Sequence, residues 1–160
     1  GYLLPWEVIP SIKAHEFTKF SSETDPKARA LAPGLAIYLH GDLGAGKTTL
    51  VRHLLRALGV QGRIKSPTYA VVEPYQVAAG SVWHFDFYRF ANPREWEDAG
   101  FRDLFASPGL KLAEWPEKAA GVLPVADLVL YIESQPDDSR RVTGLAGSPA
   151  GQAMLRDAGP

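Results

Sequence analysis

The stretch Gly41-Asp42-Leu43-Gly44-Ala45-Gly46-Lys47-Thr48 decides the fold of this 160-residue chain. It matches the pattern G-x-x-x-x-G-K-[ST], in which small residues let backbone N–H groups turn inward and make an anion site. The apolar run Ala36–Leu39 precedes it and is typical of a buried strand. After it, leucine and valine recur at helical spacing up to Leu58, and Gly59 stands where a helix ends. The order of strand, phosphate loop and helix is the one that this motif requires.

Further strands and helices follow the phosphate loop. Runs rich in β-branched, aromatic or apolar residues predict strands at 69–75, 82–89, 110–114 and 128–133, with an added edge strand at 140–143. Short helices are predicted at 93–99 and 101–106. Strands and helices mixed in this way indicate a layered α/β fold. We expect residues 1–143 to form one P-loop domain and the Gly-, Ala- and Pro-rich segment 144–160 to be a flexible tail, with one short helix around Gln152–Arg156.

Composition excludes several classes of protein. Hydrophobic residues make up 46% of the chain and charged residues 22%, which is typical of a globular domain rather than a disordered one. The absence of cysteine excludes disulfides, thiolate metal sites and cysteine nucleophiles. With 17 basic and 18 acidic residues the net charge is −1, which argues against a strongly basic, nonspecific nucleic-acid binder. No apolar run is long enough for a transmembrane helix.

The phosphate loop predicts the first site residues. The N-terminus of the following helix adds its dipole and its unpaired N–H groups to the anion site. Lys47 can reach the β- and γ-phosphates of a nucleotide, and the Thr48 hydroxyl can bind Mg²⁺, which prefers oxygen ligands. A coincidental Gly-rich turn is the alternative, but the strand and helix on either side favour the phosphate loop.

Asp86 is the first candidate for an acidic partner. In the run His84-Phe85-Asp86-Phe87-Tyr88-Arg89, strand alternation puts His84, Asp86 and Tyr88 on one face and the phenylalanines on the other. An aspartate among aromatic residues is costly unless it has a metal or hydrogen-bond partner, so Asp86 is a Walker-B-type candidate. The alternative is an aspartate at a strand end that faces solvent. His84 and Arg89 are equally compatible with structural roles.

Further candidates come from the end of a strand and from a loop. Glu114 follows a short apolar strand, and ligands of open α/β sheets bind at the carboxyl ends of strands. It can ligate Mg²⁺ or orient a water molecule, although its residue type and position alone favour a solvated glutamate beside a core tryptophan. Ser66 and Thr68 lie where many P-loop proteins carry a switch that senses the γ-phosphate, and a plain Ser-Pro turn is an equal alternative.

These motifs together resemble one family, the bacterial tRNA threonylcarbamoyladenosine biosynthesis ATPase TsaE, also called YjeE. The resemblance covers roughly 36–132 and rests on motifs in a fixed order. They are Gly41–Thr49, Lys65-Ser66-Pro67-Thr68-Tyr69, Val72-Glu73-Pro74-Tyr75, His84-Phe85-Asp86-Phe87-Tyr88-Arg89, Glu114-Trp115-Pro116-Glu117 and Gly121-Val122-Leu123-Pro124. The phosphate loop alone is generic, whereas this set in this order is highly specific.

The resemblance implies a P-loop NTPase-like three-layer domain, with a central mixed, mostly parallel sheet flanked by helices. It implies a cytoplasmic ATPase that binds ATP or ADP with Mg²⁺ and is weak alone. Its implied partner is the TsaB–TsaD pair, which it assists in installing threonylcarbamoyl on adenosine 37 of ANN-reading tRNAs. Contact with tRNA is expected to be only indirect, and no membrane is involved.

The resemblance also implies roles for individual residues. Lys47, Asp86, Thr68 and Glu114 are the expected catalytic residues, and Thr48, Glu114 and Asp86 the expected metal ligands. The expected nucleotide-binding residues are Leu43, Gly44, Ala45, Gly46, Lys47, Thr48, Thr49, Ser21 and Arg140.

Two other functions remain compatible with the sequence. A small-molecule P-loop kinase would need an acceptor pocket and a mobile lid that bears arginine. Arg94 and Arg102 are available for this, but the sequence contains no lid-like insertion. A nucleotide-gated interaction module, in which hydrolysis is incidental, would share every motif of the ATPase.

Overall fold

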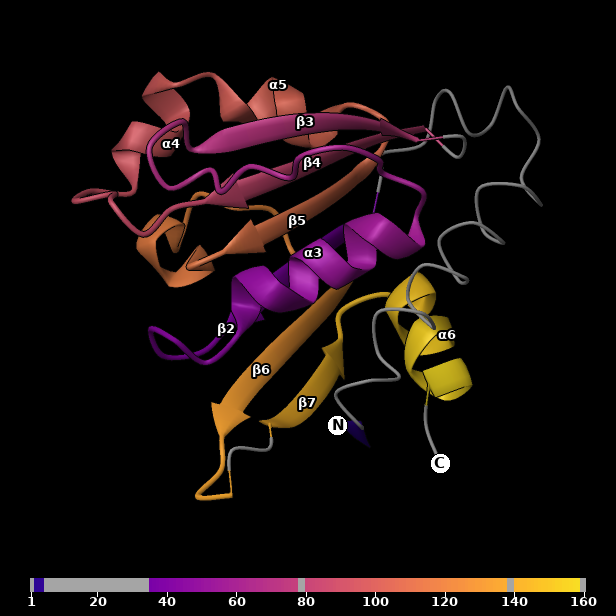
Figure 1. Cartoon of the computed structure of the whole chain (residues 1–160). Helices are drawn as coiled ribbons and strands as arrows, with labels where there is room; N and C mark the ends of the chain where they lie inside the picture. The colour runs from indigo at the N-terminus through magenta and orange to yellow at the C-terminus, as the bar shows by residue number, and fades with distance from the viewer. Residues whose placement is uncertain (1, 5–34, 78–79, 138–139, 159–160) are drawn as a thin grey trace.

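The computed structural model of the chain describes residues 2–4, 35–77, 80–137 and 140–158 (Figure 1). Seven strands in this part of the chain form one sheet in the order β1-β7-β6-β2-β5-β4-β3. The strands are β1 (Tyr2–Leu4), β2 (Ala36–His40), β3 (Val72–Val77), β4 (Gly80–Asp86), β5 (Leu110–Glu114), β6 (Leu128–Ser134) and β7 (Arg140–Ala146). The helices are α3 (Lys47–Ala57), α4 (Arg94–Asp98), α5 (Phe101–Ala106), the 3₁₀ helix η1 (Pro116–Ala119) and α6 (Pro149–Ala158).

The centre of the sheet is parallel and its margins are antiparallel. Strands β6, β2, β5 and β4 pair in parallel, whereas β3, β7 and β1 each pair antiparallel to their inner neighbour. Because β1 runs opposite to β7 and β7 opposite to β6, β1 shares the direction of the four central strands. The predicted mixed, mostly parallel sheet is therefore confirmed.

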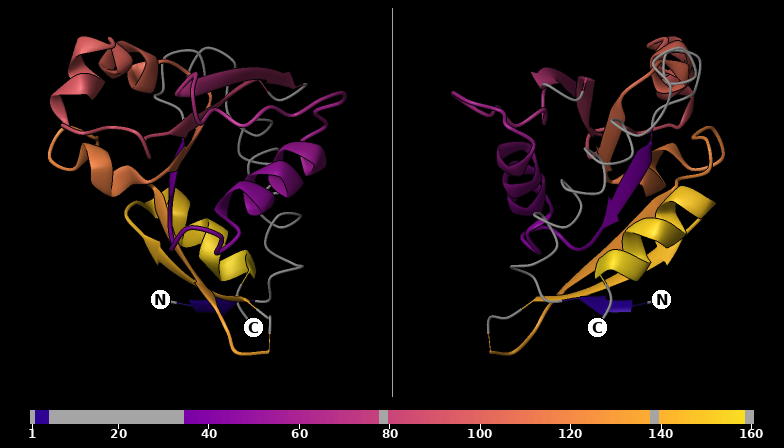
Figure 2. Two further views of the ribbon diagram at one scale, coloured as in Figure 1. Left: turned by 60° about the vertical axis from the view of Figure 1, so that its left-hand side comes forward. Right: turned by 90° about the vertical axis from the view of Figure 1, so that its right-hand side faces the viewer.

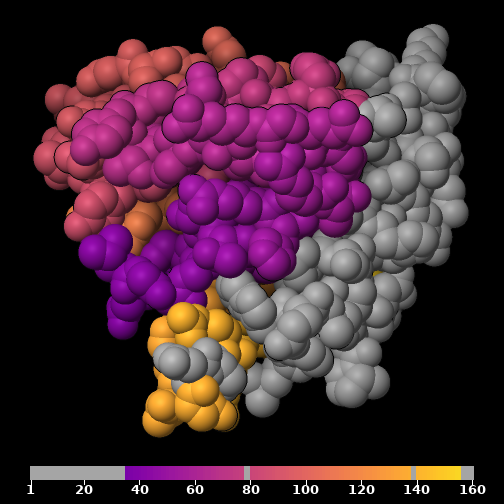
Figure 3. Space-filling view, in the orientation of Figure 1, coloured from indigo at the N-terminus to yellow at the C-terminus, as the bar shows by residue number. Residues whose placement is uncertain are grey.

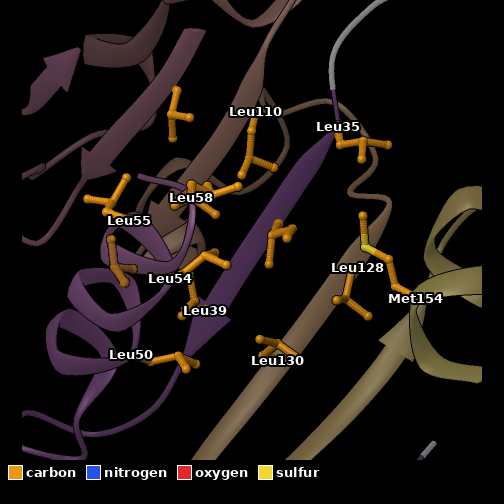
Figure 4. Close-up of a cluster of buried hydrophobic side chains, with 14 of the residues drawn as sticks. Leu35, Leu39, Leu50, Leu54, Leu55, Leu58, Leu110, Leu128, Leu130 and Met154 are labelled. Carbon is orange, nitrogen blue, oxygen red and sulfur yellow. The ribbon is translucent and has the colours of Figure 1, made fainter. Parts of the chain in front are cut away.

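Helices cover both faces of the sheet and enclose two apolar cores. In the first core, leucines of α3 pack against leucines of β2, β5 and β6, and Met154 of α6 closes the cluster (Figure 4). In the second, Phe85 and Phe87 pack against Trp96 of α4 and Phe105 of α5. The right-hand view of Figure 2 shows α3 on one side of the sheet and α4 and α5 on the other. The predicted three-layer arrangement follows from these two cores.

Because side chains alternate along β4, its polar residues point to the face of the sheet that α3 covers. Val82 packs in the core under α3, whereas Phe85 and Phe87 pack in the opposite core. His84 is in register with Leu112, which also belongs to the α3 core. The predicted separation of His84 and Asp86 from the phenylalanines is therefore confirmed, and it directs both side chains toward the phosphate loop.

The C-terminal segment differs from the sequence-based expectation. Strand β7 continues to Ala146, and β1 pairs with its outer side, so β7 is not the edge strand. Helix α6 extends the short helix expected around 152–156, and Met154 and Leu155 are buried. Up to residue 158 the expected flexible tail is thus replaced by a strand end and a packed helix. Among the described residues, none of the helices combines the length and apolarity needed to cross a bilayer.

Candidate functional site

The phosphate loop joins β2 to α3 and leaves the N-terminus of α3 free. Gly46 has φ 110°, a left-handed backbone angle that favours glycine, and α3 begins at the next residue. No acidic residue occurs in the first turn, and no side chain caps the helix. The unpaired N–H groups and the positive end of the helix dipole are therefore available to an anion.

Gly41 is required by a close approach between the loop and β6. A Cβ atom at this position would lie 2.7 Å from the backbone oxygen of Ile132. A larger residue would push the loop away from the neighbouring strand. The first glycine of the motif therefore sets the height of the loop above the sheet.

Lys47 lies under the loop with its ammonium group already engaged. Its Nζ donates to the backbone oxygens of Gly41 and of Asp42, the latter at 3.1 Å. The same Nζ lies 4.0 Å from the centre of the Trp115 ring, within range of a cation–π contact. Burial lowers the pKa of Lys47, and the nearby Glu114 carboxylate opposes this shift. A phosphate that enters the site has to compete with these contacts for the ammonium group.

Glu114 ends β5 and connects α3 with β4. Its Oε1 accepts a hydrogen bond from the Thr48 hydroxyl at 2.8 Å, and its Oε2 lies 2.6 Å from Nε2 of His84. The side chain is only 2% exposed. The prediction of a solvated glutamate, which residue type alone favours, is therefore wrong. Glu114 is buried because the end of β5 lies beside the phosphate loop, where its carboxylate contacts Thr48.

Asp86 ends β4 directly beside Glu114. The two residues are partners in the parallel register of β4 and β5. Oδ1 of Asp86 accepts a hydrogen bond from the Tyr88 backbone N–H at 2.9 Å. Burial raises the pKa of Asp86, and the Glu114 charge acts in the same direction, whereas the bond from Tyr88 opposes it. Two carboxylates thus meet at the carboxyl edge of the sheet, where a cation would stabilise both.

The Ser-Pro-Thr loop is tied to the end of β4. The hydroxyls of Ser66 and Thr68 lie 2.8 Å apart. Val71 has φ 70°, which is unusual for a β-branched residue, and its N–H donates to the oxygen of Pro67 at 2.7 Å. The Val71 oxygen accepts from the backbone N–H of Asp86 at 2.9 Å. This strained turn therefore couples the position of Thr68 to that of Asp86, and it also explains why β3 begins at Val72 rather than Tyr69.

A cavity of about 300 Å³ lies between these elements. Its lining residues come from the phosphate loop, the Ser-Pro-Thr loop and the ends of β4 and β5. They are Leu43, Gly44, Gly46, Lys47, Thr48, Thr49, Thr68, Asp86, Tyr88, Glu114 and Trp115. Leu43, at the tip of the loop, is 74% exposed. In Figure 3 the purple atoms at the left edge, where the loop lies, project from the surface.

Most of the predicted site residues that the structure describes line this one cavity, and two of them, Ala45 and Arg140, do not. Ala45 is buried and outside the lining, and its N–H donates to the Asp42 oxygen at 3.0 Å. Arg140 also lies outside it, with Nε bonded to the Ala45 oxygen at 2.8 Å, so it supports the loop from behind. Ser21 lies outside the described residues. The predicted roles of all these residues in binding or catalysis stay predictions.

Two lining residues were not predicted as site residues. Tyr88 and Trp115 both line the cavity, and their rings lie 5.0 Å apart. Trp115 has a left-handed backbone with φ 57°, which turns its ring back over Lys47. Trp115 directly follows Glu114 in the sequence and Tyr88 lies two residues after Asp86, but nothing in residue type reveals a positive φ at a tryptophan.

The donor set at this site fits Mg²⁺. Thr48, Glu114 and Asp86 offer only oxygen atoms, and two of these side chains already touch. Within the described part of the chain, no three His, Cys, Asp or Glu side chains gather to hold a metal by themselves. Mg²⁺ commonly takes one or two carboxylates and completes its shell with water and substrate phosphates. These residues therefore suit a cation that arrives with a nucleotide.

Comparisons with known proteins agree with this geometry. The family model for "threonylcarbamoyl adenosine biosynthesis protein TsaE" matches residues 14–142. A tRNA threonylcarbamoyladenosine biosynthesis protein TsaE from Haemophilus influenzae is 46% identical over 121 residues, covering 76% of this chain and 76% of that protein. Its counterpart from Bacillus subtilis is 35% identical over 111 residues, covering 69% of each. The crystal structure of Bacillus subtilis YdiB has the same fold, with a TM-score of 0.68 at 24% identity, over 92% of this chain and 86% of that one.

Proposed function

The chain belongs to the TsaE family of threonylcarbamoyl adenosine biosynthesis proteins, and from this premise we propose that it is a Mg²⁺-dependent ATPase serving threonylcarbamoyl modification of tRNA. The observation that carries the proposal is the convergence of the phosphate loop, Thr48, two carboxylates and Thr68 on one cavity of about 300 Å³. Its relatives are named for this pathway, and its fold is that of a nucleotide-binding P-loop domain.

Nucleotide binding begins at the N-terminus of α3. The N–H groups of the phosphate loop and of the first turn of α3, apart from that of Ala45, which is already bonded to the Asp42 oxygen, surround the phosphates. The helix dipole favours their negative charge. Lys47 leaves the loop oxygens and pairs with the β- and γ-phosphates. ADP retains most of these contacts, because only the γ-phosphate is missing.

The carboxyl ends of β4 and β5 supply the rest of the chemistry. Thr48 and Glu114, which already share a hydrogen bond, would hold the cation, with Asp86 beside them in the strand register. When bound, Mg²⁺ would neutralise negative charge on the phosphate oxygens. Asp86 and Thr68 orient a water molecule for in-line attack on the γ-phosphate, which yields ADP and inorganic phosphate.

We propose that the TsaB–TsaD pair is the partner of this ATPase and that its hydrolysis serves their modification of adenosine 37. A net charge of −1 gives the chain little general attraction for tRNA, which supports an indirect contact. Slow turnover alone is expected because Lys47 is held by its own loop and by Trp115. Docking of a partner against the exposed loop can release it.

The kinase alternative finds no support in the arginines that it needs. Arg102 forms an ion pair with Glu97 at 2.8 Å on the surface, so its guanidinium group is not directed at a phosphate. Neither Arg94 nor Arg102 lines the cavity. The site therefore favours water over a second substrate as the phosphate acceptor.

ATP hydrolysis by the purified chain, alone and with the TsaB–TsaD pair, tests the proposal. We expect slow hydrolysis alone, strong stimulation by the pair and a loss of about 100-fold or more in Lys47→Ala, since removing one charge-stabilising donor commonly costs that much. Arg52→Ala, on the exposed side of α3, is the matched control for loss of one positive charge.

Two outcomes would contradict the proposal. Hydrolysis that a verified active pair leaves unchanged would favour the kinase, and a screen of small-molecule phosphate acceptors would follow. Full support of tRNA modification by a variant that binds ATP without hydrolysing it, tested with Lys47→Ala and Glu114→Ala, would make hydrolysis incidental.

A further inference from the structure

His84 is a fully buried histidine with one described hydrogen bond. Its Nε2 lies 2.6 Å from Oε2 of Glu114, and both side chains are almost completely inaccessible, at 0% and 2% exposure. Its Nδ1 has no hydrogen-bond partner among the described residues. Burying a polar ring of this kind costs free energy unless hydrogen bonds compensate for the lost contact with water. The bond to Glu114 is the compensating hydrogen bond that the structure shows.

The Glu114 carboxylate is held from both sides. The hydroxyl of Thr48, on α3, donates a hydrogen bond to Oε1 at 2.8 Å, and the ring of His84, on β4, is hydrogen-bonded to Oε2. A glutamate at a strand end has several rotamers, and two hydrogen bonds from two different elements select one of them. The bond from His84 also satisfies the oxygen that points away from the phosphate loop, which leaves the other oxygen directed at Thr48.

His84 itself does not reach the cavity. It is absent from the cavity lining, whereas Asp86, two residues along the same strand face, lines it. The His84 side chain has no exposed surface through which a nucleotide or a cation can touch it. Any effect of His84 on the site therefore passes through Glu114.

We propose that His84 is a positioning residue that holds Glu114 in the orientation in which it shares a cation with Thr48. This inference rests on the proposed function, because it requires Mg²⁺ and a nucleotide to bind at Thr48 and Glu114. Groups that orient a metal-binding carboxylate typically contribute 10–100-fold to metal affinity. His84 is expected to act on Mg²⁺ affinity, and not on the contacts between the phosphate loop and the nucleotide.

A matched pair of substitutions isolates the hydrogen bond. In His84→Gln the amide nitrogen is as many bonds from the backbone as Nε2 and reaches Glu114. In His84→Asn the amide is shorter and does not. The affinity for ADP is measured by titration calorimetry in EDTA and across a series of Mg²⁺ concentrations, so that no turnover enters the readout. We expect His84→Asn to weaken Mg²⁺ binding to the ADP complex about 10–100-fold and to leave ADP affinity in EDTA unchanged, while His84→Gln retains most of the Mg²⁺ affinity.

Two controls separate positioning from general loss of stability. Phe85→Leu alters the neighbouring residue on the opposite face of β4, within the other core, and should leave Mg²⁺ affinity unchanged. Adding His84→Asn to Glu114→Gln should cause no further loss, because the carboxylate through which His84 acts is already gone. Thermal unfolding of each variant checks that it is folded, and His84→Phe replaces His84→Asn if the latter is not.

The outcomes distinguish this inference from the proposed function. ADP binding by the unmodified chain that is indifferent to Mg²⁺ would overturn both. Mg²⁺-dependent binding that His84→Asn leaves intact would overturn the positioning role and leave the ATPase standing. Equal losses in His84→Asn and Phe85→Leu, or a further loss on top of Glu114→Gln, would also overturn it.

Discussion

Lys111 is a charged residue placed where the fold offers almost no water. It lies in β5, opposite Ala36 of β2, and its side chain is 0% exposed. Its Nζ donates to the backbone oxygen of Ser107, at the end of α5. Burial lowers its pKa from 10.5 to about 8, and the Asp127 carboxylate opposes the shift only in part. Lys111 therefore caps α5 at the cost of burying an ammonium group at neutral pH.

Lys111→Met should change how stability depends on pH. A lysine with a lowered folded-state pKa holds fewer protons folded than unfolded between about pH 8 and 10.5, so the free energy of unfolding rises with pH across that window. Methionine has a similar length and no charge, so the variant should lack this rise of about 1.4 kcal/mol per pH unit, or about 3 kcal/mol in all. Urea unfolding from pH 7 to 10 measures the difference between the two proteins.

The same substitution at the exposed Lys118 is the control for Lys111→Met. A constant difference between the Lys111 protein and its methionine variant over the whole range would contradict the prediction. That result would mean that Lys111 keeps its proton in the folded protein.

At the scale of elements, the site could be predicted wherever a pattern is local. The phosphate loop was found because its spacing is short and its chemistry is strict, and the alternation on β4 placed Asp86 correctly. The fold then adds a register that no local pattern contains, since Asp86 and Glu114 come from strands that are far apart in the sequence. Residue type alone gives Glu114 too little weight for this reason, and only the family resemblance predicts a role for it in the site.

Contacts between elements that are distant in the sequence could not be predicted from it. The bond from His84 to Glu114 joins residues 30 positions apart, and Trp115 covers Lys47 only because its backbone is left-handed. The C-terminal segment shows the opposite error. Its glycines suggested a flexible tail, whereas the structure uses them for close approach between α6, β7 and the turn before β6.

Gly151→Ala should destabilise the docking of α6 although alanine favours helices. A Cβ atom at this position would lie 1.7 Å from the backbone oxygen of Asp127, so helix and turn have to separate. Overpacking of this kind costs about 1–3 kcal/mol, which outweighs the gain of about 1 kcal/mol in helix propensity. Urea unfolding compares the variant with Gln152→Ala, at the exposed neighbouring position. An increase in stability for Gly151→Ala would show that α6 is not packed as described.

At the scale of the whole molecule, the candidate site lies where the two cores meet. The phosphate loop and α3 contribute to one core, whereas Phe85 of β4, and Phe87 just after that strand, belong to the other. A ligand held by both Lys47 and the ends of β4 and β5 therefore contacts elements whose positions depend on both cores. Its binding is expected to stabilise the domain as a unit rather than one loop.

ADP with Mg²⁺ should therefore raise the melting temperature of the entire chain. A ligand that binds only the folded state stabilises it by about 2.7 kcal/mol at a concentration of 100 times its Kd. For a domain of this size that corresponds to a shift of about 5–10 °C. Differential scanning calorimetry should show one transition that moves as a whole, with a smaller shift for ADP in EDTA and a much smaller one in Lys47→Ala. A transition that splits, with only part of it moving, would mean that the two cores unfold independently and that the site is confined to one of them.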